Sequence, residues 1–242
     1  ADIAITDFHR APEDLPPPEV ESGWRGIESV AEEVRALGVK CHTIMCDLTK
    51  SAEIERLVED VADHYGRIDI LVNNARAIIG RDRVPVTELD EDVWNHFFAI
   101  NSTAVFLCTK FAGRKMIAQG GGKIVNIASL TTGMGLPKIT VYTGSKGALG
   151  QLTKGLAVEW AEHDIQVNAL APGFVATALN SHLWENEEFN TWILDRTPAH
   201  RVGTPEDMVG TALFLAAPAS DFVTGQVIYV DGGIMAGSVW PL

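Results

Sequence analysis

Residues 124–146 read IVNIASLTTGMGLPKITVYTGSK, and this stretch decides how the rest of the chain is interpreted. It opens with an apolar strand at residues 124–128, which delivers Ser129 at its end. A short loop follows, and Tyr142 and Lys146 then stand four residues apart at the start of a helix-compatible segment. Residues four apart share one face of a helix, so the phenol and the ammonium are expected to point the same way. The stretch therefore predicts a site for proton transfer.

Short apolar strands alternate with helices on both sides of this stretch. Strands are predicted at residues 2–6, 39–46, 68–72, 124–128, 165–169 and 227–230. Helices are predicted at residues 21–37, 51–66, 90–118, 142–163 and 204–217. Runs that are apolar on both faces indicate a parallel sheet covered by helices on both sides. No repeat or linker divides the chain, so we expect one doubly wound, Rossmann-like α/β domain over residues 1–242.

The composition limits the classes of function. A length of 242 residues with 46% apolar content suits one domain with a large core. A net charge of -13 argues against a nucleic-acid partner and against an anionic membrane surface. The three cysteines lack the spacing of metal ligands, and no apolar run approaches the ~18 residues of a membrane span. Buried thiols and no visible signal peptide predict a cytoplasmic protein.

The predicted chemistry follows from three side chains. A free tyrosine is a poor base near neutrality, but a cation on the next helical turn stabilises the phenolate. Tyr142 beside Lys146 can then take a proton from an alcohol or give one to a carbonyl. Ser129 can stabilise charge that develops on the same oxygen, so no metal is needed. No side chain accepts a hydride, and the reaction therefore requires a cofactor.

A Y-x-x-x-K pattern alone is weak, since many helices contain one by chance. Ser129, 13 residues before Tyr142 and at a strand end, makes the combination specific. With these residues in place, the chain resembles the short-chain dehydrogenase/reductase family. The pieces that carry the resemblance, in the family's order, are Cys46-Asp47-Leu48-Thr49, Asn73-Asn74-Ala75, Asn101, Ser129, Tyr142 to Lys146, Pro172-Gly173 with Thr177, and Asp231-Gly232-Gly233.

The resemblance implies roles for the matching residues. Ser129 polarises the substrate oxygen, Tyr142 is the general acid/base, and Lys146 binds the nicotinamide ribose and tunes Tyr142. Asn101 holds a water in a proton relay. The implied cofactor-binding residues are Asp7, Asp47, Leu48, Asn73, Ala75, Tyr142, Lys146, Pro172, Gly173, Val175 and Thr177. For each single Asn or Asp among them, a local turn or cap is the alternative role.

Asp7 decides the predicted cofactor. An acid at the end of this strand can bond to the adenosine ribose hydroxyls and repel a 2′-phosphate, which favours NAD over NADP. His9 and Arg10 follow closely and could soften that choice. A solvated turn residue is the alternative for Asp7.

The chain departs from the family in two places. The glycine-rich loop that cradles the pyrophosphate is absent, since no G-x-x-x-G-x-G occurs in the chain. The strand before that loop normally lies between the second and fourth, and without it backbone groups in the core would lose their partners. We therefore expect the natural protein to include roughly 25–35 further residues, by the family's usual layout. The second departure is Arg76, which stands where Gly is usual and could obstruct or contact a ligand.

The substrate prediction rests on a likeness at the level of the subfamily. Residues 187–203 and 225–235 look most like those of gluconate 5-dehydrogenases and related sugar-acid or polyol enzymes. This likeness implies a role in carbohydrate metabolism, on a secondary alcohol or ketone. Arg83 could contact a substrate carboxylate, or be a solvated loop arginine. Trp184, with His182 and Asn180, lies on the expected lid over the site, or only packs it.

Two other functions remain open. A 3-oxoacyl carrier-protein reductase of the same fold would use NADPH and usually shows a basic docking patch, which this acidic chain does not suggest. A non-catalytic cofactor-sensing or interaction protein is favoured by the missing loop and opposed by intact Ser129, Tyr142 and Lys146. Family members are commonly tetramers built through the helices that here carry Asn101 and Tyr142, and the resemblance therefore implies a homotetramer.

Overall fold

The computed structural model describes residues 1–8, 26–77, 81–177 and 180–237. The predicted proline loop at residues 12–18 lies outside the described residues, as do His9, Arg10 and the side chain of His182. All six predicted strands are confirmed. Their observed ends lie within three residues of the predicted ends. They are β1 (Ile3–Asp7), β2 (Cys41–Met45), β3 (Ile70–Asn73), β4 (Gly122–Ile127), β5 (Ile165–Pro172) and β6 (Val227–Val230).

The strands are all parallel, and they form two sheets. One sheet has the order β1-β2, and the other has the order β3-β4-β5-β6. The division falls between β1 and β3, where the sequence predicts that a strand is missing. No described strand pairs with the outer edge of β3, and the side chains of Ile70 and Val72 are 37% and 51% exposed. The parallel α/β class is confirmed, with an open break in the sheet.

The predicted helices also form. They include α2 (Ile27–Ala36), α3 (Ser51–Tyr65), α6 (Thr140–Trp160) and α9 (Pro205–Ala216). The long helix predicted at residues 90–118 is a continuous run of α4 (Glu91–Phe98), a π-helical turn η3 (Ala99–Ala104) and α5 (Val105–Gln119). Two short helices, α7 (Ser181–Trp184) and α8 (Glu187–Arg196), lie between β5 and α9.

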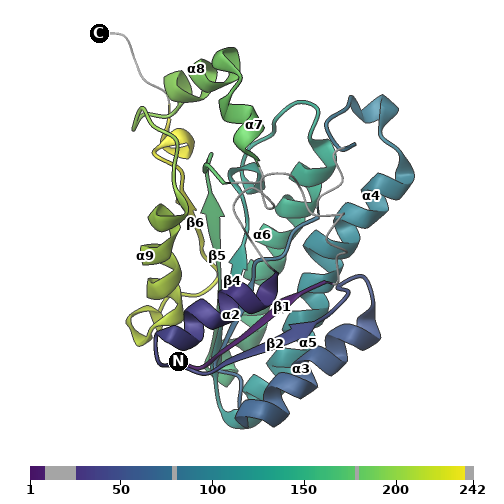
Figure 1. Cartoon of the computed structure of the whole chain (residues 1–242), viewed down its shortest axis with the longest axis vertical. Helices are drawn as coiled ribbons and strands as arrows, with labels where there is room; N and C mark the ends of the chain where they lie inside the picture. Colours follow the sequence, from purple (N-terminus) through teal and green to yellow (C-terminus); the bar gives the residue numbers. More distant parts are fainter. Residues whose placement is uncertain (9–25, 78–80, 178–179, 238–242) are drawn as a thin grey trace.

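Helices cover both faces of the larger sheet (Figure 1). On one face, Ile124 and Val167 pack against α3, α5 and Trp160 of α6. On the other face, Val125 and Leu170 pack against Leu215 of α9. Neighbouring residues of one strand thus enter different cores, as expected for strands that are apolar on both sides. The carboxyl ends of all strands consequently meet at one edge, where ligands bind in sheets of this kind.

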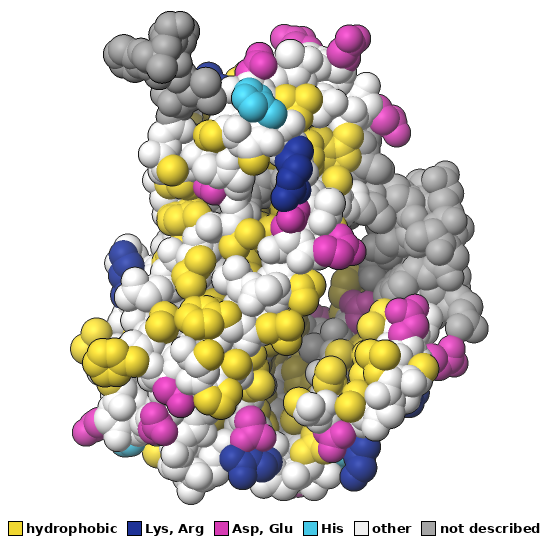
Figure 2. Space-filling model, turned by 90° about the vertical axis from the view of Figure 1, so that its left-hand side faces the viewer, with side chains coloured by type: hydrophobic (Ala, Val, Ile, Leu, Met, Phe, Trp, Pro, Cys, Tyr) yellow, Lys and Arg dark blue, Asp and Glu magenta, His cyan; other side chains and the backbone are white. Residues whose placement is uncertain are grey.

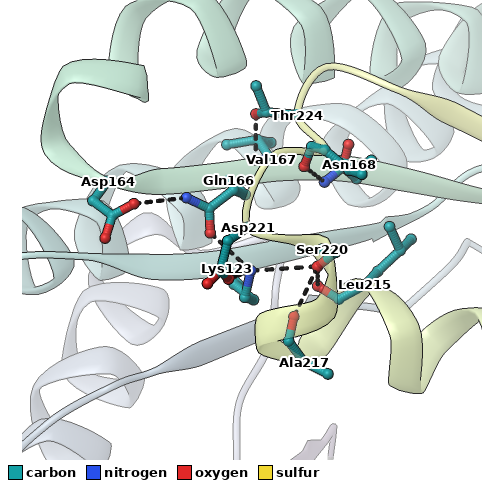
Figure 3. Close-up of polar contacts among 11 residues, drawn as sticks. Lys123, Asp164, Gln166, Val167, Asn168, Leu215, Ala217, Ser220, Asp221 and Thr224 are labelled. Atoms are coloured by element: carbon teal, nitrogen blue, oxygen red, sulfur yellow. Dashed lines mark hydrogen bonds and ion pairs between the residues drawn. The ribbon is translucent and has the colours of Figure 1, made fainter.

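At the opposite, amino end of the sheet, a buried lysine connects neighbouring strands through hydrogen bonds and an ion pair (Figure 3). Lys123 of β4 is 9% exposed, and its Nζ donates to Gln166 Oε1 at 2.8 Å and to Ser220 Oγ at 3.3 Å. The same Nζ pairs with Asp221 Oδ1 at 2.7 Å. Since Ser220 and Asp221 precede β6, this cluster fastens three consecutive strands at the end remote from Ser129. Among the helices described, none is both long and apolar enough to cross a bilayer.

Candidate active site

Ser129 follows β4 directly and is fixed by a reciprocal cap. Its side chain accepts a hydrogen bond from the N–H of Thr131, and its own N–H donates to Thr132 Oγ1 at 3.3 Å. Thr132 Oγ1 also donates to the main-chain oxygen of Lys146 at 3.2 Å. A single threonine thus links the strand end that carries Ser129 to the helix that carries Lys146. Ser129 is buried, with 7% of the residue exposed, and lies at the carboxyl edge of the sheet.

Tyr142 and Lys146 lie on one side of α6, as the spacing predicts. Lys146 Nζ is 6.0 Å from the centroid of the Tyr142 ring, and it donates to the carbonyl of Ile127 at 2.6 Å. The ammonium is almost completely buried, and burial lowers the pKa of Lys146 to about 8, with a further contribution from the charge of Arg76. An ammonium can donate three hydrogen bonds, and the carbonyl of Ile127 accepts one of them. Two donors remain for a ligand.

Asn101 lies in the π-helical turn η3, a conformation that occurs mostly at functional sites. Its side chain is fully buried and joins two parts of the site. Oδ1 accepts the N–H of Ala77 at 2.8 Å, and Nδ2 donates to Ser145 Oγ at 2.9 Å. Ser145 Oγ in turn donates to the carbonyl of Tyr142 at 2.9 Å. Asn101 therefore connects the loop after β3 with the helix turn that presents Tyr142.

Asn73 supports the sheet from inside, at the end of β3. Its Nδ2 donates to Asn126 Oδ1 at 2.8 Å and to Thr109 Oγ1 at 3.2 Å. Asn126 continues the chain of bonds to Thr153 Oγ1 at 3.0 Å. These amides and hydroxyls connect β3, β4, α5 and α6 just below the carboxyl edge, which is the supporting position that the resemblance implies for Asn73.

Asp7 and Asp47 end the neighbouring strands β1 and β2. The N–H of Cys46 donates to the main-chain oxygen of Asp7 at 2.8 Å, which brings the two carboxylates to the same edge. Hydrogen bonds from Thr49 lower the pKa of Asp47, and Lys50 Nζ lies 3.1 Å from its Oδ2. The carboxylate of Asp47 therefore also closes its own turn. Leu48 packs against the core beside it.

The segment after β5 approaches the end of β6 closely. Gly173 donates to the carbonyl of Val230 at 3.0 Å, and a Cβ at Gly173 would lie 2.7 Å from Asp231 Cα. Pro172 ends the strand beside it. This close approach requires glycine and keeps the backbone edge free of side-chain bulk, as a bound dinucleotide also requires.

Asn180 organises the predicted lid. Its Oδ1 accepts hydrogen bonds from the N–H of Thr177 at 2.8 Å and from Trp184 Nε1 at 3.1 Å, while Nδ2 donates to the carbonyl of Val175 at 2.8 Å. Val175 also bridges Gly203 in parallel register. The residues predicted to touch the nicotinamide amide and the substrate thus form one hydrogen-bonded unit after β5.

Two predicted residues are less tightly placed. Ala75 is exposed in the loop after β3, at the expected edge. Arg83 is exposed in the loop before the short helix Val86–Glu88, and no hydrogen bond or ion pair joins it to Ser129 or Tyr142 in the part of the chain that the structure describes. Within the same ranges, no group of three or more His, Cys, Asp or Glu side chains is arranged to hold a metal ion.

Sequence reasoning missed the residues that hold the site together. Thr132, Asn126, Thr153 and Ser145 all act through hydrogen bonds to backbone or amide groups. The Ser-x-x-Thr spacing of Ser129 and Thr132 is a capping-box pattern and was the one available signal. The others could not be inferred, because their partners are distant in sequence.

Comparison with known proteins gives the family of this chain. Residues 23–235 match the family described as enoyl-(acyl carrier protein) reductase. The chain is 41% identical to 5-keto-D-gluconate 5-reductase of Escherichia coli K12 over 86% of this chain and 81% of that protein. Identity is also 41% with gluconate 5-dehydrogenase of Gluconobacter oxydans, over 86% of this chain and 80% of the relative.

Among solved structures, a gluconate 5-dehydrogenase from Burkholderia cenocepacia superposes with a TM-score of 0.86 at 36% identity. The superposition covers 98% of this chain and 86% of that one. These matches extend across the strands, the helices and the site described above. The chain belongs to the short-chain dehydrogenase/reductase family of oxidoreductases.

Proposed function

We propose that this enzyme interconverts a secondary alcohol and a ketone of a sugar acid, with a nicotinamide dinucleotide as the hydride carrier. The observation that carries the proposal is the pairing of Ser129 with the Tyr142–Lys146 helix face through Thr132 and Ile127. The substrate class is supported by the names of the relatives, which act on gluconate or keto-gluconate. Those names also favour this function over the carrier-protein reductase and the non-catalytic alternatives.

The nicotinamide end of a dinucleotide fits the residues present. Buried Lys146 has two donors left over, which suit ribose hydroxyls, and Gly173 leaves the backbone edge accessible. Val175 and Thr177 lie in the hydrogen-bonded unit beside it. Asp7 and Asp47 stand at the edge where the adenosine half would lie. The cofactor supplies the hydride acceptor or donor, and the protein supplies the proton chemistry.

In the oxidation direction, Tyr142 takes the proton from the alcohol oxygen as the C–H bond gives up its hydride. Ser129 donates a hydrogen bond to that oxygen and stabilises its developing negative charge. Lys146 stabilises the phenolate form of Tyr142 electrostatically. We assign to Asn101 the water of a proton relay towards solvent, supported by its link to Ala77 and Ser145. In the reduction direction each proton movement is reversed.

Two observations favour different cofactors, one NAD and the other NADP. The carboxylate of Asp7 favours NAD, because it repels a 2′-phosphate. The solved Burkholderia cenocepacia relative is in complex with NADP and tartrate, and two further solved relatives hold NADP. The ratio of kcat/KM for the two cofactors decides between them. If Asp7 discriminates, Asp7→Ser raises the NADP/NAD ratio by about 10-fold.

We also propose a cytoplasmic homotetramer. Cys41, Cys46 and Cys108 are all free and buried, and burial raises the pKa of Cys108 to about 12. Unpaired thiols suit a reducing compartment.

For assembly, Figure 2 shows hydrophobic side chains gathered over the face that carries α9, where Leu213 is 65% exposed. On the helices that carry the site, Val158 is 83% exposed. Light scattering behind size exclusion gives the mass that tests this assembly.

The activity test uses gluconate and 5-keto-gluconate with each cofactor, followed by NAD(P)H absorbance. We expect turnover by the parent protein and a loss of about 10²- to 10⁴-fold in kcat for Tyr142→Phe. Tyr65→Phe is the matched control, since the Tyr65 hydroxyl bonds to the Ile3 carbonyl at 2.9 Å, away from the site. A parent protein that turns over no sugar acid, polyol or β-keto ester with either cofactor would show that the proposal is wrong.

A further inference from the structure

Arg76 places a second positive charge at the carboxyl edge, beside the catalytic helix. It stands three residues beyond the end of β3, at the same edge as Ser129 and Lys146. The next residue, Ala77, is 2% exposed and held by Asn101 through its N–H at 2.8 Å. Ala77 also packs in a cluster that Tyr142 borders. The backbone that carries Arg76 is therefore fixed against the active site, while the side chain itself is exposed.

Within the part of the chain that the structure describes, no carboxylate pairs with this charge. Other arginines of the chain are paired, for example Arg81 with Asp90 and Asp92 and Arg201 with Asp207. Arg76 forms no ion pair with any carboxylate in residues 1–8, 26–77, 81–177 and 180–237. The charge of Arg76 acts on the ammonium of Lys146, where it contributes to the lowered pKa of that amine.

Among the described residues, neither Arg76 nor Lys146 has a carboxylate partner, although the protein carries a net charge of -13. Their mutual repulsion disfavours the ligand-free site and is relieved when a negative group binds between them. An arginine guanidinium offers a planar fork of donors that matches the two oxygens of a carboxylate or phosphate. The arrangement is thus suited to an oxyanion and not to a neutral alcohol.

We propose that Arg76 is a specificity-determining residue that binds an oxyanion of the ligand next to Tyr142 and Lys146. The position of the ligand in this inference rests on the proposed function. The binding of an oxyanion by Arg76 does not depend on it. An oxyanion can come from the carboxylate of a sugar acid or from a phosphate of the dinucleotide. Both sources are compatible with a guanidinium at this edge, and binding experiments separate them.

The test measures equilibrium binding by calorimetry, with tartrate as a carboxylate probe and with NAD and NADP as phosphate-bearing probes. We expect Arg76→Gln to weaken one class of probe by about 10- to 100-fold, the usual effect of losing a charged hydrogen-bond partner. Arg76→Lys keeps the charge but loses the fork, and should recover part of the affinity. Arg56→Gln is the control, because Arg56 is an exposed arginine on α3 and is not among the candidate site residues.

Each outcome has one meaning. A loss confined to tartrate identifies the substrate carboxylate as the source, and a loss confined to the dinucleotides identifies a phosphate. Unchanged or tighter binding of all three probes by Arg76→Gln overturns the inference. Since binding requires no turnover, an inactive parent protein whose affinity depends on Arg76 would contradict the proposed function and leave the oxyanion site standing.

Discussion

Lys146 Nζ donates a hydrogen bond to the carbonyl of Ile127 at 2.6 Å. This bond joins α6 to the last residue of β4, two residues before Ser129. The amine of Lys146 therefore has a second role besides its position one helical turn from Tyr142. Its bond to Ile127 fixes where α6 lies along β4. Burial of the amine disfavours its charged form, and the charge of Arg76 adds to this effect, so the pKa of Lys146 falls to about 8.

The stability of the protein should report the titration of Lys146. Folding lowers the pKa of Lys146 from 10.5 to about 8, so the unfolded chain binds more protons between these values. The free energy of unfolding therefore rises with pH across this window. Compared with Lys146→Met, the parent protein should gain roughly 2 kcal/mol between pH 7.5 and 10. Urea unfolding of both proteins at the two pH values measures the gain, and an equal response of both would contradict it.

Removing Asn101 should cost both stability and activity. Asn101→Ala leaves the buried N–H of Ala77 without its acceptor and Ser145 without its donor. We expect a loss of about 1–3 kcal/mol in the free energy of unfolding and a fall in kcat. Asn95→Ala is the control, since Asn95 is exposed on α4 and its loss should stay within about 0.5 kcal/mol. A variant as stable and as active as the parent would show that this link is dispensable.

The amino-end cluster around Lys123 should affect stability alone. Lys123→Met leaves Gln166 Oε1 without its charged donor in a buried position. Unfolding should become easier by about 1–3 kcal/mol, while kcat/KM stays unchanged because the site lies at the other end of the strands. Lys115→Met removes an ion pair with Glu59 that is partly exposed, and should cost under about 1 kcal/mol. A selective fall in kcat/KM without destabilisation is the result that would contradict this separation.

Two glycine substitutions should have opposite signs. Gly173→Ala brings a methyl group within 2.8 Å of Asp231 Cβ, so the ends of β5 and β6 must move apart, at a cost of about 1–3 kcal/mol. Cofactor affinity should fall as well. Gly155 lies in α6 with open space around it, and Gly155→Ala should stabilise the protein by about 0.5–1 kcal/mol. Thermal denaturation of both variants, with cofactor titration of the first, checks the pair.

The sequence predicts the strands well, because they depend on local pattern; the roles of Ser129, Tyr142 and Lys146 stay predictions. Strand β6 is found at the predicted residues 227–230, since a short apolar run between turns has few alternatives. The π-helical turn at Ala99–Ala104 could not be predicted, because its hydrophobic spacing continues that of the flanking helices. Likewise, the contact of Lys146 with Ile127 could not be predicted. Its acceptor is a backbone carbonyl, which every residue type has.

The edge of β3 that no described strand covers has a consequence for handling this 242-residue chain. The N–H of Lys123 bonds to the carbonyl of Asp69 at 2.9 Å, so the backbone groups of Ile70 and Val72 point to the other side. No described strand covers that side, and both side chains are exposed. An open, apolar strand edge is a template for pairing between molecules and hence for aggregation. For the 242-residue chain by itself, loss of soluble protein with concentration should therefore begin at this edge, and Val72→Lys should delay it.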